Sequence, residues 1–226
     1  MIPLYCGFDP REAAAYHTFC QSVMNHSSRP VSFTPLALRS LHEYQETHVD
    51  GSNAFVYSRF LVPHLQNYKG WAIFADGDML CRADINELWG LRDSNCAVMV
   101  VKHDYKTKHP QKYLGTSMQT INVDYPRKNW SSVILWNCEH PCNRILTPLY
   151  VMAAKGKQLH RFEHLDESDI GELPKEWNWI VGEYEPNPDA KIVHYSLGVP
   201  AIEKYADSEH AKEWFDALYQ LGHVDA

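Results

Sequence analysis

Two aspartates separated by one residue, Asp76 and Asp78, follow an apolar stretch that reads as a buried strand, 70–75. Carboxylates at such a position are costly to bury unless a cation compensates their charge. Gly77 lies between them and lets the backbone turn so that both carboxylates can face one divalent ion. Ligands of open α/β sheets also bind at the carboxyl ends of strands. The pattern predicts a metal site; the alternative is a solvated turn in which Asp76 caps the next element.

A histidine far along the chain is a candidate third ligand. His194 lies near the end of another strand-like run, 191–195, and precedes a turn that contains Gly198. Its imidazole and the N–H groups of the turn could face a metal-bound phosphate. Two carboxylates and one imidazole suit Mn²⁺ somewhat better than Mg²⁺. We therefore predict that Asp76, Asp78 and His194 bind Mn²⁺, with Mg²⁺ possible; a purely structural histidine is the alternative.

Strand and helix signals alternate along the part of the chain that must position these residues. A short strand at 2–6 is followed by a glycine-containing turn and by a helix whose apolar residues lie between Ala13 and Val23. Further strands are predicted at 31–35, 70–75, 96–101, 132–136 and 191–195, and helices at 54–65 (capped by Asn53), 144–155 and 208–221. This alternation predicts an α/β fold with a mixed, mostly parallel central sheet flanked by helices. No repeat or linker interrupts it, so residues 1–226 are predicted to form a single domain.

Composition excludes several classes of protein. The 226 residues carry a net charge of −7 and no Lys/Arg cluster, which argues against a nucleic-acid partner. No run of 18 apolar residues occurs, so no integral membrane segment is expected. The chain shows no export signal, and its six cysteines are irregularly spaced. Reduced thiols in the cytoplasm are therefore expected.

Several motifs, taken in order, resemble those of a known family. They are Tyr57–Pro63, Asp76-Gly77-Asp78, His103-Asp104, Asn129–Asn137, Asp166–Ile170, Leu173–Asn178, and His194-Tyr195 with Gly198. Over about residues 1–205 this series resembles the GT-A-fold glycosyltransferases numbered family 8, the glycogenin and bacterial galactosyltransferase-like group. Two departures stand out. Glu167 replaces the family's glutamine, and the family's Lys-Pro-Trp after the glycine is absent, which leaves Lys204 as a candidate substitute for a lysine that binds diphosphate.

The resemblance implies a function and a set of site residues. The expected activity is metal-dependent transfer of a hexose from a nucleotide sugar, a UDP-sugar by preference, to a hydroxyl acceptor on a glycan, lipid or protein, with retention. The half at about 1–105 would bind the nucleotide sugar, and the half at about 106–226 would bind the acceptor and carry the last metal ligand. The implied donor-binding residues are Tyr5, Gly7, Phe8, Asp9, Arg59, Asp76, Gly77, Asp78, Asn129, His194 and Gly198. The implied catalytic carboxylates around the sugar are Asp104, Asp166, Glu167 and Asp169.

Two alternatives remain open at this point. One is a catalytically idle protein of the same fold that binds a nucleotide sugar or a carbohydrate; the two departures from the family pattern support it. The other is a metal-dependent phosphohydrolase with Asp76 as nucleophile and Asp78 as acid. That chemistry usually needs a downstream pair of adjacent acids, and the sequence has no Asp-Asp pair.

Overall fold

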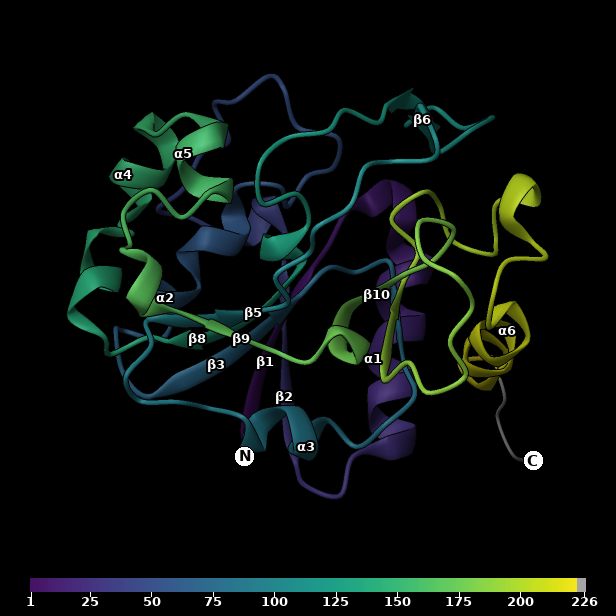
Figure 1. The fold of residues 1–226 in the computed structure, drawn as a ribbon, viewed down its shortest axis with the longest axis horizontal. Helices are drawn as coiled ribbons and strands as arrows, with labels where there is room; N and C mark the ends of the chain where they lie inside the picture. Colours follow the sequence, from purple (N-terminus) through teal and green to yellow (C-terminus); the bar gives the residue numbers. More distant parts are fainter. Residues whose placement is uncertain (223–226) are drawn as a thin grey trace.

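A six-stranded sheet with the order β2-β1-β3-β8-β5-β9 runs through the centre of the molecule (Figure 1). The computed structural model describes residues 1–222. The strands are β1 (Ile2–Gly7), β2 (Val31–Leu36), β3 (Trp71–Ala75), β5 (Val98–Val100), β8 (Val133–Asn137) and β9 (Ile170–Glu172). β1 pairs in parallel with β2 and β3, and β5 with β9, whereas β8 is antiparallel to both its neighbours. The predicted α/β fold with a mixed, mostly parallel central sheet is confirmed.

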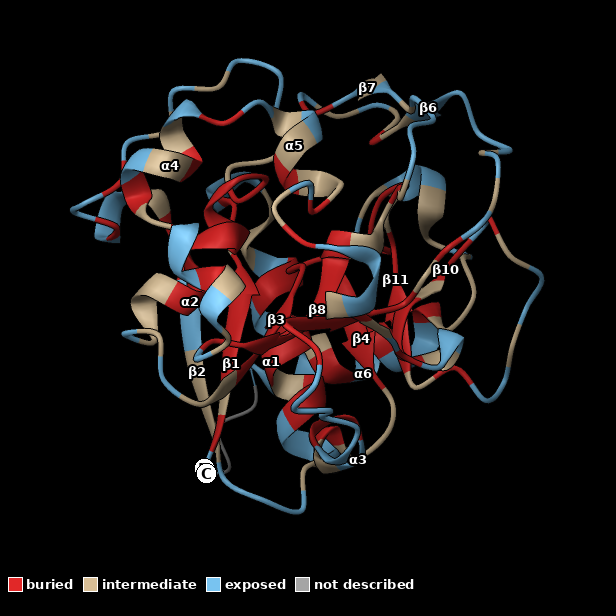
Figure 2. Ribbon diagram, turned by 60° about the vertical axis from the view of Figure 1, so that its left-hand side comes forward, coloured by how far each residue is buried: buried red, intermediate tan, exposed pale blue. Residues whose placement is uncertain are grey.

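Alternate side chains of the sheet enter two hydrophobic clusters, as the period of two along a strand requires. In β3, Phe74 packs in a cluster with Phe60, whereas Ile73 packs in a cluster with Phe19 on the opposite face. Figure 2 shows the buried core as a red band along these strands, with exposed segments outside it. The cluster around Phe74 is covered by α2 (Val62–Leu65), α4 (Pro148–Ala153) and α5 (Gly156–His160), and the opposite one by α1 (Ala13–His26) and α3 (Ile85–Gly90).

Two smaller sheets complete the architecture. One has the order β10-β11-β4, from Trp179–Ile180, Ile192–His194 and Met79–Cys81. Helix α6 (Ala211–Gln220) packs on it and on α1 through a third hydrophobic cluster. The other is a hairpin of β6 (Gln111–Lys112) and β7 (Thr120–Ile121) at the periphery of the molecule.

Two predicted helices are shorter than expected. Residues 54–57 form turns, and only a 3₁₀ turn (Ser58–Leu61) followed by α2 is helical. Asn53 does not cap them, because its side-chain oxygen is buried and accepts no hydrogen bond. The helix predicted over 144–155 begins at Pro148, where Thr147 caps the first turn through its hydroxyl. Among the helices of residues 1–222, none is both long enough and apolar enough to cross a membrane.

Candidate metal centre and substrate cleft

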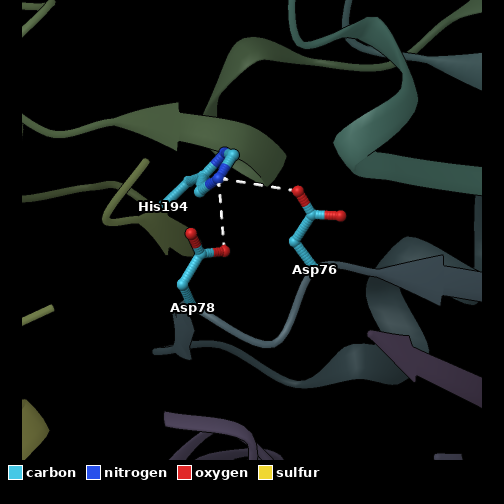
Figure 3. A group of neighbouring side chains, drawn as sticks. All are labelled: Asp76, Asp78 and His194. Carbon is cyan, nitrogen blue, oxygen red and sulfur yellow. Dashed lines mark ion pairs between the residues drawn. The ribbon is translucent and has the colours of Figure 1, made fainter. Parts of the chain in front are cut away.

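Asp76, Asp78 and His194 lie together in the folded chain, and their side chains point toward one another (Figure 3). Nε2 of His194 is 3.4 Å from Asp78 Oδ1 and 3.8 Å from Asp76 Oδ2. All three side chains are buried, and one ligand atom from each lies within 4.8 Å of the others. The three predicted metal ligands are thus brought to one point, although 116 residues separate Asp78 from His194.

Strand pairing explains this convergence. β3 ends at Ala75 and β4 begins at Met79, so the acidic pair occupies the connection between the central sheet and the smaller one. β4 is antiparallel to β11 in a register that places His194 opposite Met79. The N–H of Tyr195 then donates to the carbonyl of Asp78 at 3.0 Å. The sheet ladder therefore fixes the imidazole beside the second carboxylate.

The connection needs glycine at its centre. A Cβ atom on Gly77 would lie 2.4 Å from the carbonyl oxygen of Gly7, at the end of β1. Backbone at that distance cannot give way, so any side chain here would push the acidic turn away from the sheet. Gly77 allows the close approach of two backbone segments that holds Asp76 and Asp78 in place.

A neighbouring amide orients the imidazole. Nδ1 of His194 is 3.0 Å from Asn178 Oδ1, while the Asn178 amide nitrogen donates to Ser132 Oγ at 2.8 Å and to the Asn129 carbonyl at 3.2 Å. These two donations assign the oxygen of Asn178 to the histidine, and an oxygen can only accept. Nδ1 therefore carries a hydrogen, and Nε2 faces the carboxylates. Histidine ligands of metal sites are usually oriented in this way.

Arg59 balances part of the acidic charge. Its Nη1 lies 2.8 Å from Asp76 Oδ1, and it also donates to the carbonyl of Ser131, with both partners of the ion pair buried. Burial raises the pKa of Asp76 to about 6 against the opposing charge of Arg59, and Asp78 adds to the rise. Burial acts in the same direction on Asp78, but His194 outweighs it and the pKa of Asp78 is lowered. The two carboxyls therefore have different proton affinities.

The three residues fit a divalent cation. Asp76 Oδ1 and Asp78 Oδ1 are buried and accept no hydrogen bond, and Arg59 approaches the first of them only as an ion pair. Buried carboxylate oxygens without donors are costly, and a cation would satisfy them. A divalent ion would bind the unprotonated Nε2 of His194 together with the two carboxylates. Two oxygens and one imidazole nitrogen form a donor set for a divalent metal ion.

The triad lies on the wall of a cleft of about 570 Å³. Eight of its 25 lining residues are Lys, Arg or Asp. The wall contains five Lys or Arg side chains, which are Arg59, Lys112, Lys128, Lys157 and Arg161. It contains three carboxylates, which are Asp50, Asp76 and Asp78. A protein of net charge −7 thus has a cleft with an excess of positive charge, which suits an anionic ligand.

The predicted donor-binding residues fall into two groups. Those that line the cleft are Arg59, Asp76, Asp78, Asn129 and His194. The N-terminal ones, together with Gly77 and Gly198, lie outside its lining. Tyr5 packs in the core, Phe8 packs edge-to-face on Tyr16, and Asp9 accepts hydrogen bonds from Arg11 and the Ala54 N–H.

Both remaining glycines of the predicted set have a packing role. A Cβ on Gly7 would lie 2.3 Å from the Phe55 ring. Gly198 has φ +145°, and a Cβ there would lie 2.4 Å from the Tyr205 ring. The N–H of Gly198 donates to the Tyr195 carbonyl at 2.8 Å, so it closes the tight turn that follows His194.

The structure places the four predicted catalytic carboxylates outside the lining of the cleft. Asp104 is exposed. Asp166 and Asp169 cap the same 3₁₀ turn reciprocally before β9. Glu167 is exposed and forms an ion pair with Arg127. Each therefore has a local structural role or faces solvent in this conformation.

Three side chains around the triad were not expected from the sequence. Lys112 and Tyr113 belong to the β6–β7 hairpin, and the Tyr113 hydroxyl donates to Asp78 Oδ2 at 3.3 Å. Asn178 is the last residue of the motif Leu173–Asn178, so the sequence marked this residue. The motif did not indicate that Asn178 contacts His194. No local pattern marks Lys112, because its position depends on how a distant loop folds back.

Solved structures of glycosyltransferases share the fold of this chain. The apo bifunctional glycosyltransferase WbbM superposes with a TM-score of 0.67 at 15% identity, covering 96% of this chain and 49% of that one. An active-site mutant of LgtC gives 0.63 at 11% identity, covering 99% and 98%. GlyE of Streptococcus pneumoniae TIGR4 gives 0.61 at 14% identity, covering 96% and 60%. The chain thus spans about half the length of WbbM, and the likenesses show that it has the GT-A fold.

One curated protein is similar in sequence over nearly the whole chain. No protein-family model matches. Protein CDI of Arabidopsis thaliana is 41% identical over 224 residues, which cover 95% of this chain and 85% of that protein. Identity at this level over most of both sequences establishes common descent. The chain, a GT-A-fold protein with a buried Asp-Asp-His cluster, belongs to the same family as Protein CDI.

Proposed function

We propose that this protein is a metal-dependent glycosyltransferase. It would transfer a hexose from a nucleotide sugar, with a UDP-sugar as the expected donor, to a hydroxyl acceptor. One observation carries the proposal: in a GT-A fold, Asp76, Asp78 and His194 meet on the wall of a cationic cleft. A nucleotide sugar has a diphosphate that a cation can bridge to carboxylates. LgtC, which has a similar fold, has been solved with donor and acceptor sugar analogues.

The side chains of the triad would hold Mn²⁺, with Mg²⁺ as the alternative ion. Asp76 and Asp78 would each provide an oxygen, and His194 would provide Nε2, which Asn178 keeps turned toward them. A bound divalent ion would supply Lewis-acid stabilisation of the negative charge on the departing diphosphate. Arg59 fixes the first carboxylate through their buried ion pair.

The transfer itself exchanges one bond for another. The bond between the anomeric carbon and the diphosphate oxygen breaks, and its electron pair goes to the diphosphate. The acceptor hydroxyl oxygen bonds to the same carbon, and its proton goes to the departing diphosphate. Within residues 1–222, the carboxylates of the cleft wall are Asp50, Asp76 and Asp78. Because Asp76 and Asp78 are assigned to the metal and Asp50 accepts a hydrogen bond from the Tyr57 hydroxyl, front-face attack with retention is favoured over a double displacement through an enzyme nucleophile.

Residues of both halves of the chain line the cleft. Residues before position 105 contribute Arg59 and the acidic pair, and residues after it contribute Asn129 and His194. Asn129 adopts left-handed backbone with φ +61°, and its amide donates to Tyr105 at 2.9 Å. We place the donor across both halves, and the acceptor, a glycan, lipid or protein hydroxyl, at the open side of the cleft. The catalytic roles of Asp104, Asp166, Glu167 and Asp169 would require these side chains to move toward the sugar.

A second candidate function is supported by the position of those four carboxylates. Because they lie outside the cleft lining, the chain could bind a nucleotide sugar without turning it over. A phosphohydrolase is less favoured, because its nucleophile, Asp76, is engaged by Arg59. The cytoplasm remains the proposed location, on the basis of the cysteine spacing.

Incubation with a panel of nucleotide sugars and Mn²⁺ tests the proposal. A glycosyltransferase will release a nucleoside diphosphate from one donor, faster when the acceptor is present. Tight binding of the nucleoside diphosphate without turnover of any donor would favour the idle binder. Release of inorganic phosphate from simple phosphate esters, with no reaction of any nucleotide sugar, would favour the hydrolase.

A further inference from the structure

The β6–β7 hairpin is fixed against the metal centre at the residue after Lys112. Tyr113 is buried, and its hydroxyl donates to Asp78 Oδ2 at 3.3 Å. Its N–H donates to the carbonyl of Leu197 at 2.6 Å, and the N–H of Leu114 donates to the hydroxyl of Tyr205 at 3.2 Å. The hairpin is thus bound to the turn that follows His194. Lys112, one residue away from these contacts, has a defined place on the cleft wall.

The ammonium group of Lys112 has no anionic partner in the part of the chain that the structure describes. Its Nζ donates to the hydroxyl of Ser52 at 3.1 Å and lies 5.4 Å from the centre of the Tyr113 ring. Among residues 1–222, no carboxylate oxygen lies within 4.0 Å of it. Burial lowers the pKa of Lys112, while Asp78 and Asp76 oppose this effect, so the ammonium group lies in the field of both metal ligands. A partly buried charge without a counter-ion is costly and favours an anionic ligand.

The other cations of the cleft wall are differently placed. Arg59 is paired with Asp76 and bonded to two carbonyls. Lys128 donates to Asn122 and Asp124, and Arg161 is paired with Glu163 at 4.0 Å. The exposed Lys157 lies on α5, on the side of the central sheet away from α1. Lys204, the substitute suggested by the sequence, is exposed and outside the cleft lining.

We propose that Lys112 binds the diphosphate of the nucleotide sugar and of the nucleoside diphosphate that is released. This assignment rests on the proposed function, because it presupposes a diphosphate held by the Asp-Asp-His site. The ammonium group acts as a point charge with two N–H donors that remain after its bond to Ser52. In this way a residue of the β6–β7 hairpin supplies a cation to the phosphate side of the metal centre.

Calorimetric binding of UDP in the presence of Mn²⁺ tests the assignment. Lys112→Gln is expected to raise the Kd for UDP roughly 10- to 100-fold, the effect of losing one hydrogen bond to a charged group. Lys112→Arg, which keeps the charge, should restore most of the affinity. Lys106→Gln is the matched control, because this exposed lysine lies six residues before Lys112 and outside the cleft lining. Uridine, which has no phosphate, should bind all four proteins equally, and their circular dichroism spectra should agree.

The possible outcomes distinguish a wrong assignment of Lys112 from a wrong proposed function. If Lys112→Gln binds UDP as tightly as Lys106→Gln does, the role of Lys112 is contradicted while the proposed function stands. If uridine binding falls by the same factor as UDP binding, Lys112 acts on the shape of the cleft and the assignment is also wrong. If the wild-type protein binds neither UDP nor inorganic pyrophosphate with Mn²⁺, the proposed function itself fails, and the assignment fails with it.

Discussion

Nδ1 of His194 lies 3.0 Å from Oδ1 of Asn178, so the amide holds the imidazole with Nε2 toward the acidic pair. Asn178→Ala removes this acceptor and should weaken Mn²⁺ binding by about 10- to 100-fold, the usual cost of losing an orienting partner. Asn178→Asp keeps the acceptor for Nδ1 but loses the two donations to Ser132 and Asn129, so it should be less stable than the wild type while binding Mn²⁺ more tightly than the alanine variant. Titration of Mn²⁺ followed by electron paramagnetic resonance measures both. Equal affinity of the alanine variant and the wild type would show that the contact does not orient a ligand.

Arg59 and Asp76 form a buried ion pair, with exposed fractions of 4% and 6%. Arg59→Gln should destabilise the metal-free protein by about 3–5 kcal/mol, because it leaves a buried carboxylate without its partner. The loss should be smaller with Mn²⁺ bound, since the ion also compensates Asp76. Urea unfolding with and without Mn²⁺ gives both values. A metal-free loss below about 1 kcal/mol, the range of exposed pairs, would contradict the burial of this pair.

The raised pKa of Asp76, about 6, sets an expected pH dependence of metal binding. A protonated carboxyl must lose its proton before it can bind a metal ion. Below pH 6 the Mn²⁺ affinity should therefore fall by up to about tenfold for each pH unit, and above pH 6 this contribution should level off. Measurement of the Kd at pH 5, 6 and 7.5 checks the sign and the position of the change. Asp76→Asn should bind Mn²⁺ more weakly and should lack the pH dependence that comes from Asp76. Tighter binding of Mn²⁺ by the wild type at pH 5 than at pH 7.5 would contradict the account.

His164 should make the fold sensitive to acid. Both of its ring nitrogens are buried without a hydrogen-bond partner, and burial lowers the pKa of His164 to about 4. As the pH falls below about 6.5, the unfolded chain takes up a proton that the folded chain does not, so stability falls with pH. The contribution reaches about 2 kcal/mol at pH 5, from about 1.4 kcal/mol per unit.

Urea unfolding at pH 7.5 and pH 5 compares the relevant variants. His164→Phe should lose less stability than the wild type over this interval. The exposed His109 provides the control, and His109→Gln should keep the wild-type difference. If His164→Phe and the wild type show the same loss between the two pH values, the lowered pKa of His164 is wrong.

The order of elements and the Asp-Asp-His cluster could be predicted from the sequence because their signals are local. An apolar run that ends in Asp76-Gly77-Asp78 marks a strand followed by a turn with two carboxylates. The run that ends at His194 marks a second strand end. Only the register of β4 on β11 was needed to join them, and sheet formation supplies it.

Residues whose roles depend on distant contacts could not be found in this way. Lys112 lies on the cleft because Tyr113, at φ +56°, binds Leu197 across the fold. Nothing in the neighbouring sequence encodes that contact. Conversely, an acidic residue can fit a functional motif and a capping motif at the same time. Asp166 and Asp169 match a family motif, but in the structure they cap a turn.

Release of UDP from a UDP-sugar, measured with and without Mn²⁺ in the wild type and in Asp78→Asn, tests the central claim most directly. Asp78 is a proposed metal ligand, whereas Asp207, which is exposed and outside the cleft lining, gives the matched control Asp207→Asn. The account predicts Mn²⁺-dependent release by the wild type and the control, and at least a 100-fold loss in Asp78→Asn, as on the order of 3 kcal/mol of electrostatic stabilisation disappears. Release that does not depend on Mn²⁺, or that survives unchanged in Asp78→Asn, would contradict it.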